Sequence, residues 1–345
     1  MFVRNAWYVA AWGSAIGDAL TPVRMLDEEI VLYRMSDGRV AALEDACPHR
    51  KLPLSMGRRK GDAVECGYHG LTFDCSGTCL RVPGTEHVPH RARVRAYPSE
   101  ERYGLVWLWM GDPALADPAL IFDVQHWGDP EWGMNAGDAM EVNCNYLYLT
   151  DNLLDPSHVA WVHPTSFGNA ACEETPLETT VAESGVTVWR WMTGVEPAPF
   201  YAQFMPFEGL CDRKQHYEVR TPSHAIIRAI FTPEGTGGEG RPLDPRAFIM
   251  DSYNFMTPVD GGRTRYFWFQ MRNVAPHDPD VSAKFATSVR GAFEEDRVVL
   301  EAVQRGMDKA RTPHLDLGID GGPKRFRQKV ARLIEAETQH REAAE

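Results

Sequence analysis

A chain of 345 residues with 36 Lys and Arg against 48 Asp and Glu, and a formal net charge of −12, is long enough for two domains. The acidic balance argues against a protein that grips nucleic acid by neutralising its phosphates. Its apolar runs are shorter than the roughly 18 to 20 residues that span a bilayer, and the N-terminus lacks the pattern of a signal peptide. We therefore expect a cytoplasmic protein that binds neither nucleic acid nor membrane.

Residues 1–112 are predicted to form an antiparallel β-domain. Short runs of β-branched and aromatic residues, separated by Gly and Asp, occur at 31–34, 40–44, 63–66, 71–74, 79–82 and 105–110. The segment Gly111-Asp112-Pro113 breaks this pattern. We place the domain boundary after residue 112.

Residues 113–345 are predicted to form an α+β domain with a central antiparallel sheet. Helical periodicity appears at 146–161, 281–310 and 323–336. Strand-like runs appear at 186–192, 215–220, 225–232, 248–256 and 264–272. The sequence PVDGG at 258–262 predicts a hairpin between the last two strands.

A group of Cys and His residues in the first domain has the spacing of a metal site. Cys47 and His49 are followed, after sixteen intervening residues, by Cys66 and His69, so each of two loops offers one thiolate and one imidazole. In a chain without a signal peptide, clustered Cys indicates metal or redox chemistry more often than disulfides. Such a pair of loops could hold one metal or two.

Two kinds of metal site accept this set of ligands. A structural zinc takes two Cys and two His, but zinc fingers commonly place the His pair on a helix. A Rieske [2Fe-2S] centre has two Cys on one iron and two His on the other. The sequences CPHR at 47–50 and CGYHG at 66–70 resemble the Rieske family. The resemblance implies that one iron is bound by Cys47 and Cys66 and the other by His49 and His69.

A second group of polar residues lies between residues 151 and 163, where Asp151, Asn152, Asp155, His158 and His163 follow one another closely. Two imidazoles and one carboxylate make the facial triad of oxygen-activating iron(II), which leaves coordination positions open. The alternative is structural: an Asp-Pro pair is an ordinary helix start, and a single His beside a Trp is usually packed.

The second group is similar to the catalytic-domain signature of Rieske oxygenases, and the resemblance implies a helix-grip-type α+β domain. It also implies that His158 and His163 bind the iron together with a carboxylate on the helix at 281–310. Three acidic residues, Glu294 to Asp296, are candidates there. We choose Asp296, which matches the family's position and lies on the apolar stripe of that helix. Glu295 ranks second.

The resemblance also implies roles for two residues that are not ligands. The carboxylate of Asp155 would accept hydrogen bonds from an iron-bound His and from a cluster-bound His of a neighbouring subunit, and so form an electron-transfer bridge between the two sites. Asn152 would lie near the iron as a positioning residue. Because the family forms trimeric rings, we expect a homotrimer with transfer between subunits.

Resemblance extends over most of the chain and includes the opening NAWYVAAW and a late TPV, YFW and RN pattern typical of vanillate and dicamba O-demethylases. It implies the terminal oxygenase of a multicomponent Rieske monooxygenase, which uses O2 and electrons from a separate NAD(P)H-dependent reductase or ferredoxin. A small, vanillate-like aromatic acid would be hydroxylated or O-demethylated. Methyl groups of sulfonated, N-methylated or non-aromatic compounds are alternatives.

Partner and substrate contacts can be assigned only as hypotheses. Five basic residues around the first cluster loop could attract an acidic ferredoxin: Arg50, Lys51, Arg58, Arg59 and Lys60. Strand alternation places Ile227 and Asn254 on faces that could reach a substrate pocket, with Asn254 as a polar anchor. Two non-enzyme alternatives are a Rieske electron-transfer or ligand-binding protein without turnover and a zinc-stabilised binding domain.

Overall fold

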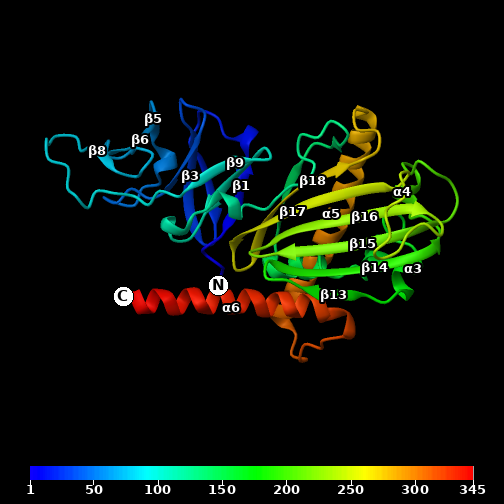
Figure 1. The fold of residues 1–345 in the computed structure, drawn as a ribbon. Coiled ribbons are helices and arrows are strands. Elements are labelled where there is room, and N and C mark those ends of the chain that lie inside the picture. The colour runs from blue at the N-terminus through cyan, green and yellow to red at the C-terminus, as the bar shows by residue number, and fades with distance from the viewer. Residues whose placement is uncertain (345) are drawn as a thin grey trace. The chain divides into compact units, whose positions relative to one another are not determined.

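The structure is a computed structural model that describes residues 1–344. Contacts within the chain divide it into two compact units (Figure 1). Unit 1 contains Met1–Asp123, Thr257–Gly261 and the end of the chain from Glu337, and unit 2 contains Val124–Met256 and Gly262–Ala336. The boundary expected after residue 112 concerns folding domains and stays a prediction.

Unit 1 is built from small antiparallel sheets, as predicted for this part of the chain. Its strands are β1 (Trp7–Trp12), β2 (Thr21–Met25), β3 (Glu28–Arg34), β4 (Val40–Glu44), β5 (Arg58–Lys60), β6 (Ala63–Glu65), β7 (Thr72–Phe73), β8 (Cys79–Arg81), β9 (Ser99–Arg102) and β10 (Leu105–Trp109). They form three sheets with the orders β1-β10-β9, β2-β3-β4 and β5-β6-β7-β8. Short 3-10 turns lie at Gly13–Ala15, Leu54–Met56, Pro113–Leu115 and Pro118–Leu120.

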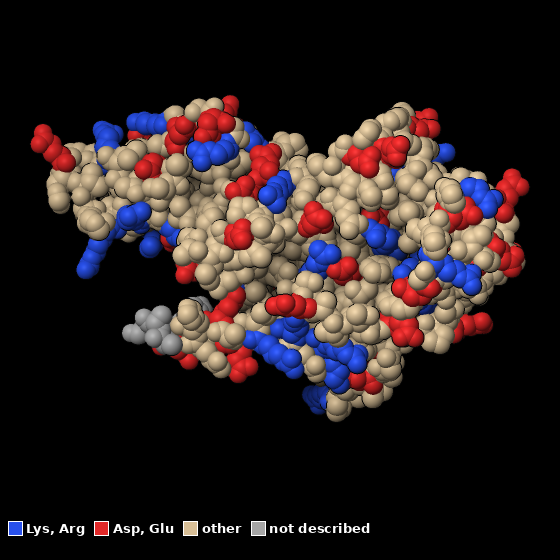
Figure 2. Space-filling view, in the orientation of Figure 1, with Lys and Arg blue, Asp and Glu red and all other residues tan. Residues whose placement is uncertain are grey.

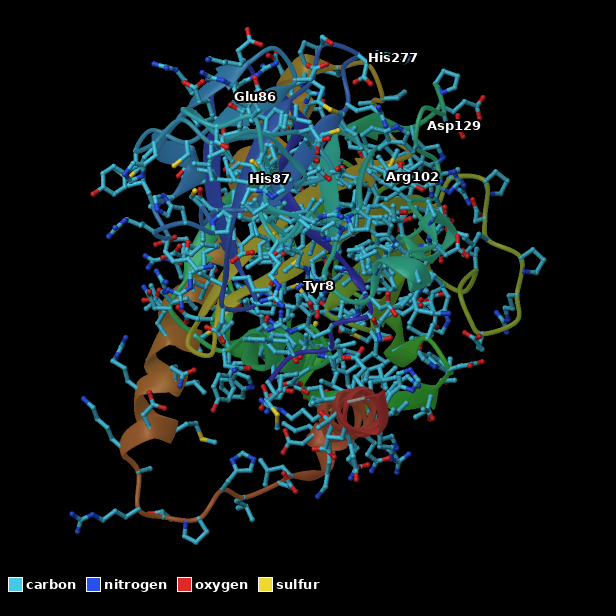
Figure 3. All side chains as sticks on the ribbon, turned by 90° about the vertical axis from the view of Figure 1, so that its left-hand side faces the viewer. Tyr8, Glu86, His87, Arg102, Asp129 and His277 are labelled. Atoms are coloured by element: carbon cyan, nitrogen blue, oxygen red, sulfur yellow. The ribbon has the colours of Figure 1, made fainter. Side chains whose placement is uncertain are left out.

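Burial in unit 1 differs between β1 and the connection that follows β8. Tyr8 of β1 is fully buried, and its hydroxyl donates a hydrogen bond of 2.7 Å to the carbonyl of Val3. Glu86 and His87, on the connection between β8 and β9, are exposed (Figure 3). Acidic and basic side chains are interspersed over the face of the molecule shown in Figure 2.

Unit 2 is an α+β unit with one eight-stranded sheet, also as predicted. Its strands are β11 (Gly133–Met134), β12 (Asp138–Val142), β13 (Glu178–Val181), β14 (Gly185–Val195), β15 (Cys211–Arg220), β16 (His224–Pro233), β17 (Phe248–Asp260) and β18 (Arg263–Arg272). The strand order is β13-β14-β15-β16-β17-β18-β11, and β12 also pairs with β18. Each of β14 to β17 runs for ten residues or more, so the sheet is long enough to form one continuous wall.

The helices from residue 146 onward are mostly short, apart from two long ones near the end of the chain, the second of which continues into unit 1. They are α1 (Tyr146–Asn152), α2 (Val159–Val162), α3 (Ala171–Glu174), α4 (Pro199–Ala202), α5 (Pro279–Lys309) and α6 (Gly321–Ala344), with a 3-10 turn at Gly318–Asp320 before α6. Among the described residues, no helix is both long and apolar enough to cross a bilayer. In Figure 1, α5 lies against one face of the sheet.

Helix α5 positions the expected carboxylate ligand. Its N-terminus is capped by Asp278, whose side chain accepts hydrogen bonds from the N–H groups of Asp280 and Val281. The buried residues of the helix are Phe285, Val289, Ala292, Asp296 and Leu300. Asp296 therefore lies on the buried stripe, as predicted. The periodic apolar positions of this helix continue to Val303 and Met307, but these are 40% and 45% exposed and line a cavity.

Two other sequence predictions differ from the structure. The helix expected over 146–161 is two short helices, since α1 ends at Asn152 and α2 begins at Val159. Pro156 lies in the break and disfavours helical backbone at the residue before it. The expected hairpin turn at 258–262 is shorter than predicted, because β17 continues to Asp260 and only the two glycines remain between the strands.

Candidate metal centres and the cavity beside them

The first candidate metal centre is built on two loops of unit 1 that share one hydrogen-bonding pattern. In the first loop the Cys47 N–H donates to the Leu52 carbonyl (2.9 Å), and the Lys51 N–H donates to the Cys47 carbonyl (2.8 Å). Lys51 adopts a left-handed backbone with φ of +59°. The loop therefore closes on itself and fixes the direction of the Cys47 side chain.

The second loop repeats this pattern around Cys66. Its N–H donates to the Leu71 carbonyl (2.8 Å), and its carbonyl accepts from the Gly70 N–H (3.1 Å). Gly70 has φ of +71°, so it occupies the place that Lys51 occupies in the first loop. Glycine adopts this conformation without strain, whereas another residue pays for the approach of its Cβ to the backbone.

The side chains of these loops gather as a cluster site would require. Cys47 and Cys66 are 2% and 3% exposed and belong to one buried group of side chains. The rings of His49 and His69 have centroids 4.5 Å apart. Burial raises the pKa of the Cys47 thiol, which a bound cation offsets by favouring the thiolate. Two buried thiols and two neighbouring imidazoles fit a Cys2His2 [2Fe-2S] cluster.

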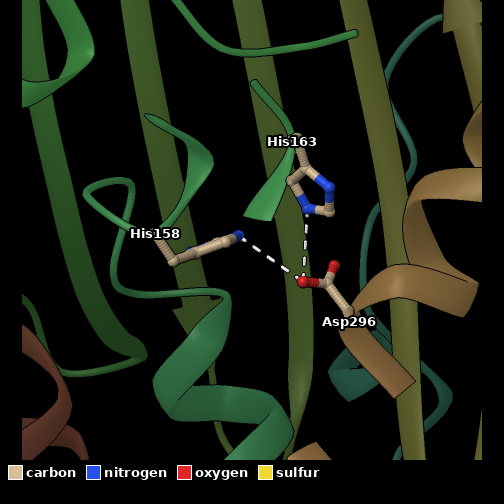
Figure 4. Close-up of side chains that lie close together, drawn as sticks. All are labelled: His158, His163 and Asp296. Carbon is tan, nitrogen blue, oxygen red and sulfur yellow. Dashed lines mark ion pairs between the residues drawn. The ribbon is translucent and has the colours of Figure 1, made fainter. Parts of the chain in front are cut away.

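The second candidate centre lies in unit 2 and consists of His158, His163 and Asp296. One ligand atom from each lies within 4.8 Å of the others. The Asp296 Oδ1 is 3.7 Å from His158 Nε2 and 3.2 Å from His163 Nε2 (Figure 4). Two imidazole nitrogens and one carboxylate on one side of a common point fit the facial triad of mononuclear iron(II).

The break between α1 and α2 gives the two His residues their positions. His158 is the residue directly before α2, and His163 directly follows it. A spacing of five residues would put them on different faces of a continuous helix. Because α2 has only four residues and the chain leaves the helix at His163 with φ of −120° and ψ of 42°, both rings reach Asp296.

The outer nitrogen of each ring contacts an acceptor. His163 Nδ1 lies 2.6 Å from Glu295 Oε2, and His158 Nδ1 makes a short contact with the main-chain carbonyl of Asp155. Since a carboxylate and a carbonyl only accept hydrogen bonds, both Nδ1 atoms carry hydrogens. Each Nε2 faces Asp296. It carries a hydrogen when the imidazole is protonated, and a metal that displaced this hydrogen would bind to the Nε2 lone pair.

The contact of Asp155 differs from the one that the resemblance implied. Its main-chain oxygen, and not its carboxylate, is the partner of His158. The carboxylate accepts a hydrogen bond of 2.9 Å from the N–H of Ser157, because the side chain folds back over Pro156 in an Asx turn. The role of the Asp155 carboxylate as a bridge between the two metal sites stays a prediction.

The Asp296 carboxylate is held as an anion although it is buried. Burial raises its pKa, but hydrogen bonds from His163 and Asn152 and the charge of His158 outweigh burial and lower it below the ordinary value. The Asn152 Nδ2 donates to Asp296 Oδ1 over 3.1 Å. Asn152 therefore lies beside the candidate iron site and orients its carboxylate, in keeping with a positioning role.

A cavity opens directly beside these three residues. Most of its wall is apolar or aromatic, from Leu153, Val159, Phe167, Ile227, Met250, Val289, Ala292 and Phe293, and its polar groups away from the metal site come from Tyr201, Tyr217 and Ser252. Ile227 thus lies where the sequence placed it. Asn254 does not reach the cavity wall: its side chain donates to the Ser252 carbonyl (2.8 Å) and accepts from the Tyr266 hydroxyl (2.8 Å).

Several of these side chains were missed by the sequence reasoning. Glu295 was ranked only as a second ligand, although it contacts His163. Tyr201 comes from the four-residue helix α4, and helices of this length carry no periodic signal. Tyr217 and Ser252 could have been found from strand alternation, because cross-strand neighbours pair Tyr217 with Ile227 and Ile227 with Ser252.

Comparison with known proteins decides between the alternative interpretations of the two candidate metal centres. The family model of the Rieske [2Fe-2S] domain matches residues 6–98, and that of the vanillate O-demethylase oxygenase C-terminal domain matches residues 142–336. The chain belongs to the Rieske oxygenases with this C-terminal domain. It is an oxygenase component, with a Rieske [2Fe-2S] cluster and a mononuclear iron as its cofactors.

Relatives of the Rieske oxygenase cover its whole length. The iron-sulfur subunit TsaM1 of the toluene-4-sulfonate monooxygenase system of Comamonas testosteroni is 38% identical over 98% of each chain. A vanillate O-demethylase oxygenase subunit of Pseudomonas sp. (strain HR199 / DSM 7063) is 36% identical over 100% of this chain and 98% of the other. The crystal structure of dicamba monooxygenase bound to 3,6-dichlorosalicylic acid superposes with a TM-score of 0.90 at 32% identity, covering 98% and 99% of the two chains.

Gly70→Ala tests the backbone requirement of the second cluster loop. At φ of +71° an added Cβ would lie 3.0 Å from Cγ of Pro83. We expect a loss of about 1–2 kcal/mol in the free energy of unfolding, measured by urea unfolding followed through the visible absorbance of the cluster. Gly17→Ala is the control, since a Cβ there meets nothing within 4 Å. If both variants were equally stable, a side chain at residue 70 would cause no backbone strain, and the prediction would be wrong.

Asp296→Ala tests the mononuclear site. The variant should lose the mononuclear iron and keep the [2Fe-2S] cluster, because the two sites draw on different residues. Iron and acid-labile sulfide analysis of the purified protein measures both. Glu294→Ala is the matched control, since Glu294 is on the same helix and pairs with Arg297. Unchanged iron content in Asp296→Ala would show that another residue is the carboxylate ligand.

Glu295→Ala tests the support of His163. Loss of the carboxylate removes the acceptor of the Nδ1 hydrogen, so the affinity for the mononuclear iron should fall about 10- to 100-fold. Competition with a chelator measures that affinity while the cluster spectrum stays unchanged. An iron affinity equal to that of Glu294→Ala would show that Glu295 has no such function.

Proposed function

We propose that the protein hydroxylates a methyl or methoxy carbon of a small, vanillate-like aromatic acid. The observation that carries this proposal is the cavity of mainly apolar and aromatic side chains beside the His158, His163 and Asp296 triad. Each turnover would consume O2, two electrons and two protons, place one oxygen in a C–H bond and release the other as water. A hydroxylated methoxy group then collapses to a phenol and formaldehyde.

The side chains of the cavity suit an aromatic ring with one reactive substituent. The Phe167 and Phe293 rings supply apolar surface beside the triad, and Val289 and Ala292 of α5 add smaller side chains to the wall. Such walls hold a ring by burial of apolar surface and keep water away from the reacting carbon. When bound, the metals supply electron storage at the cluster and O2 activation at the mononuclear iron.

The electrons would come from a separate NAD(P)H-dependent reductase or ferredoxin. Relatives are named as the iron-sulfur subunit of a system and as an oxygenase subunit, which supports a divided assembly. The basic collar expected around the first cluster loop is weaker than the sequence suggested. Arg58 and Lys60 both pair with the buried Glu65, and Arg59 pairs with Asp18 over 3.0 Å. Arg50 and Lys51 are exposed and would carry most of the steering.

The homotrimer and the cytoplasmic location belong to this proposal as well. A second, larger cavity reaches Asn152, Asp155 and His158, and its wall includes Asp151 and Arg327, which form an ion pair. This cavity would let a neighbouring subunit bring its cluster loop toward Asp155. Asp155 would then act as the bridge between the two metal sites, as the resemblance implies.

A sulfonated methylarene is the second candidate substrate. It is favoured by the 38% identity to a subunit of a toluene-4-sulfonate monooxygenase system. Both candidates have the same outline, a benzene ring with an oxyanion at one end and a methyl or methoxy carbon elsewhere. Another relative is named as a dicamba O-demethylase, which is consistent with the first candidate, oxidation of a methoxy carbon.

Reconstitution with a reductase tests the proposal. The holoprotein with NADH, O2 and a phthalate- or vanillate-type reductase would be given vanillate or toluene-4-sulfonate. We expect formaldehyde from the first or a benzylic alcohol from the second, in proportion to the O2 consumed. Asp296→Ala is the control and should form neither product. O2 consumption that neither compound accelerates would contradict the proposed substrate class.

A further inference from the structure

One wall of the cavity contains two tyrosine side chains that lie close to two buried arginines. Tyr201 and Tyr217 are 4% and 8% exposed and both line the cavity. Tyr217 lies on the face of β15 that also carries Arg213 and Gln215, because alternate residues of a strand share a face. Arg190 of β14 is the cross-strand neighbour of Gln215. The two phenols therefore stand beside two guanidinium groups.

Arg213 is a buried cation whose partners are all neutral. It is 1% exposed. Its Nη2 donates to the carbonyl of Phe167 (2.8 Å), and its Nη1 donates to Sγ of Cys172 (3.3 Å). Its guanidinium carbon lies 5.4 Å from the ring centroid of Tyr201. The Nε has no hydrogen-bond partner among the described residues.

Arg190 has the same kind of environment and is 2% exposed. It donates from Nε to Gln215 Oε1 (2.7 Å), from Nη1 to the carbonyl of Thr175 (2.9 Å) and from Nη2 to the carbonyl of Pro156 (3.1 Å). The Nε2 of Gln215 is buried and makes no hydrogen bond within residues 1–344. The hydrogen-bond partners of Arg190 are all neutral, and the Asp155 carboxylate interacts electrostatically with Arg190 without forming an ion pair among the described residues.

Buried cations are ordinarily paired with an anion, because an isolated charge in a protein interior is costly. Within the part of the chain that the structure describes, neither Arg190 nor Arg213 forms an ion pair with a carboxylate. The Tyr217 hydroxyl interacts electrostatically with both guanidiniums and with Tyr201. Burial raises the pKa of Tyr201 to about 12, so its hydroxyl stays protonated and can donate.

The position of Phe167 relates this wall to the metal site. Its ring centroid is 6.3 Å from that of His163 and 5.5 Å from that of Tyr201. Phe167 is also the residue whose carbonyl holds Arg213. The Phe167 ring thus lies between His163 and Tyr201, and a substrate ring beside Phe167 could reach both.

We propose that the oxyanion of the substrate, a carboxylate or a sulfonate, binds at the Tyr201 and Tyr217 hydroxyls, with Arg190 and Arg213 supplying positive potential behind them. This inference rests on the proposed function and names the part of the cavity that selects an aromatic acid. Hydrogen bonds to an ionised acceptor are stronger than those between neutral groups. The bound anion adds negative charge beside two guanidiniums that form no ion pair within the described residues, and its ring places the methyl or methoxy carbon toward the triad.

Calorimetric titration of the purified holoprotein with three probes tests this subsite. Toluene-4-sulfonate and 4-methylbenzoate are the anions, and 4-methylbenzyl alcohol is the neutral compound of similar shape. We expect the tighter anion to bind at least about tenfold better than the alcohol, since a hydrogen bond to a charged group contributes about 1.5–3 kcal/mol. Which anion binds more tightly identifies the group as carboxylate or sulfonate.

The double variant Tyr201→Phe with Tyr217→Phe keeps both rings and removes both donors. It should lower the affinity for the anion about tenfold or more and leave the affinity for the alcohol within about twofold. Tyr253→Phe is the control, because Tyr253 is a fully buried tyrosine of β17 whose hydroxyl contacts the Gln125 carbonyl. Arg213→Met, checked for its melting temperature, should also weaken the anion selectively.

Two binding results would overturn the subsite. One is equal affinity of the wild-type protein for the alcohol and both anions, and the other is an equal loss for anion and alcohol in the double variant. Failure of the proposed function would look different: with a reductase present, none of the three probes would accelerate O2 consumption. A protein that oxidises the alcohol as readily as the anions would contradict the subsite alone and leave the oxygenase function intact.

Discussion

The buried negative charge of Asp296 is the constraint on which the catalytic unit depends. A carboxylate that is 5% exposed is costly unless cationic or hydrogen-bonding partners surround it. Here Asn152 donates to it, His158 and His163 face it, and the mononuclear iron would add further positive charge. The long α5 carries the carboxylate to this point, and the break between α1 and α2 brings the two imidazoles to the same place.

At the end of the cavity away from the metal site, the buried charge is positive. Arg190 and Arg213 are held by carbonyls, a thiol and an amide, and these dipoles orient the guanidiniums without cancelling their charge. A site built in this way favours an anionic ligand and rejects a neutral one, because only the anion completes the electrostatics. The metal end and the phenol end of the cavity would then divide the work, with chemistry at one and selection at the other.

Much of the fold and of the metal sites could be predicted from the sequence. The spacing of Cys47, His49, Cys66 and His69 is a short-range pattern that few other structures explain, and the period of the helix at 281–310 placed Asp296 on its buried face. Patterns of this kind work because the residues that matter are close in sequence or share one regular element. The strand alternation also placed Ile227 at the cavity.

The parts that could not be predicted depend on contacts between distant segments. Glu295 lies next to Asp296 and is 49% exposed at its side chain, yet it reaches His163 because α2 ends beside α5. The carbonyl of Asp155 replaces its carboxylate because a local turn competes for the side chain. The Asn254 side chain makes hydrogen bonds to Ser252 and Tyr266 inside the sheet. The alternation of residues along a strand does not predict such bonds. Tertiary packing decides each of these cases.

The central claim is that one chain holds both a Rieske cluster and a mononuclear iron. It is tested most directly by EPR of the anaerobically purified protein, oxidised and dithionite-reduced, with iron, zinc and acid-labile sulfide analysis of the same sample. The account predicts a reduced Rieske signal, two sulfides per chain and iron in excess of the two atoms of the cluster. A colourless protein that contains zinc and no sulfide would contradict it.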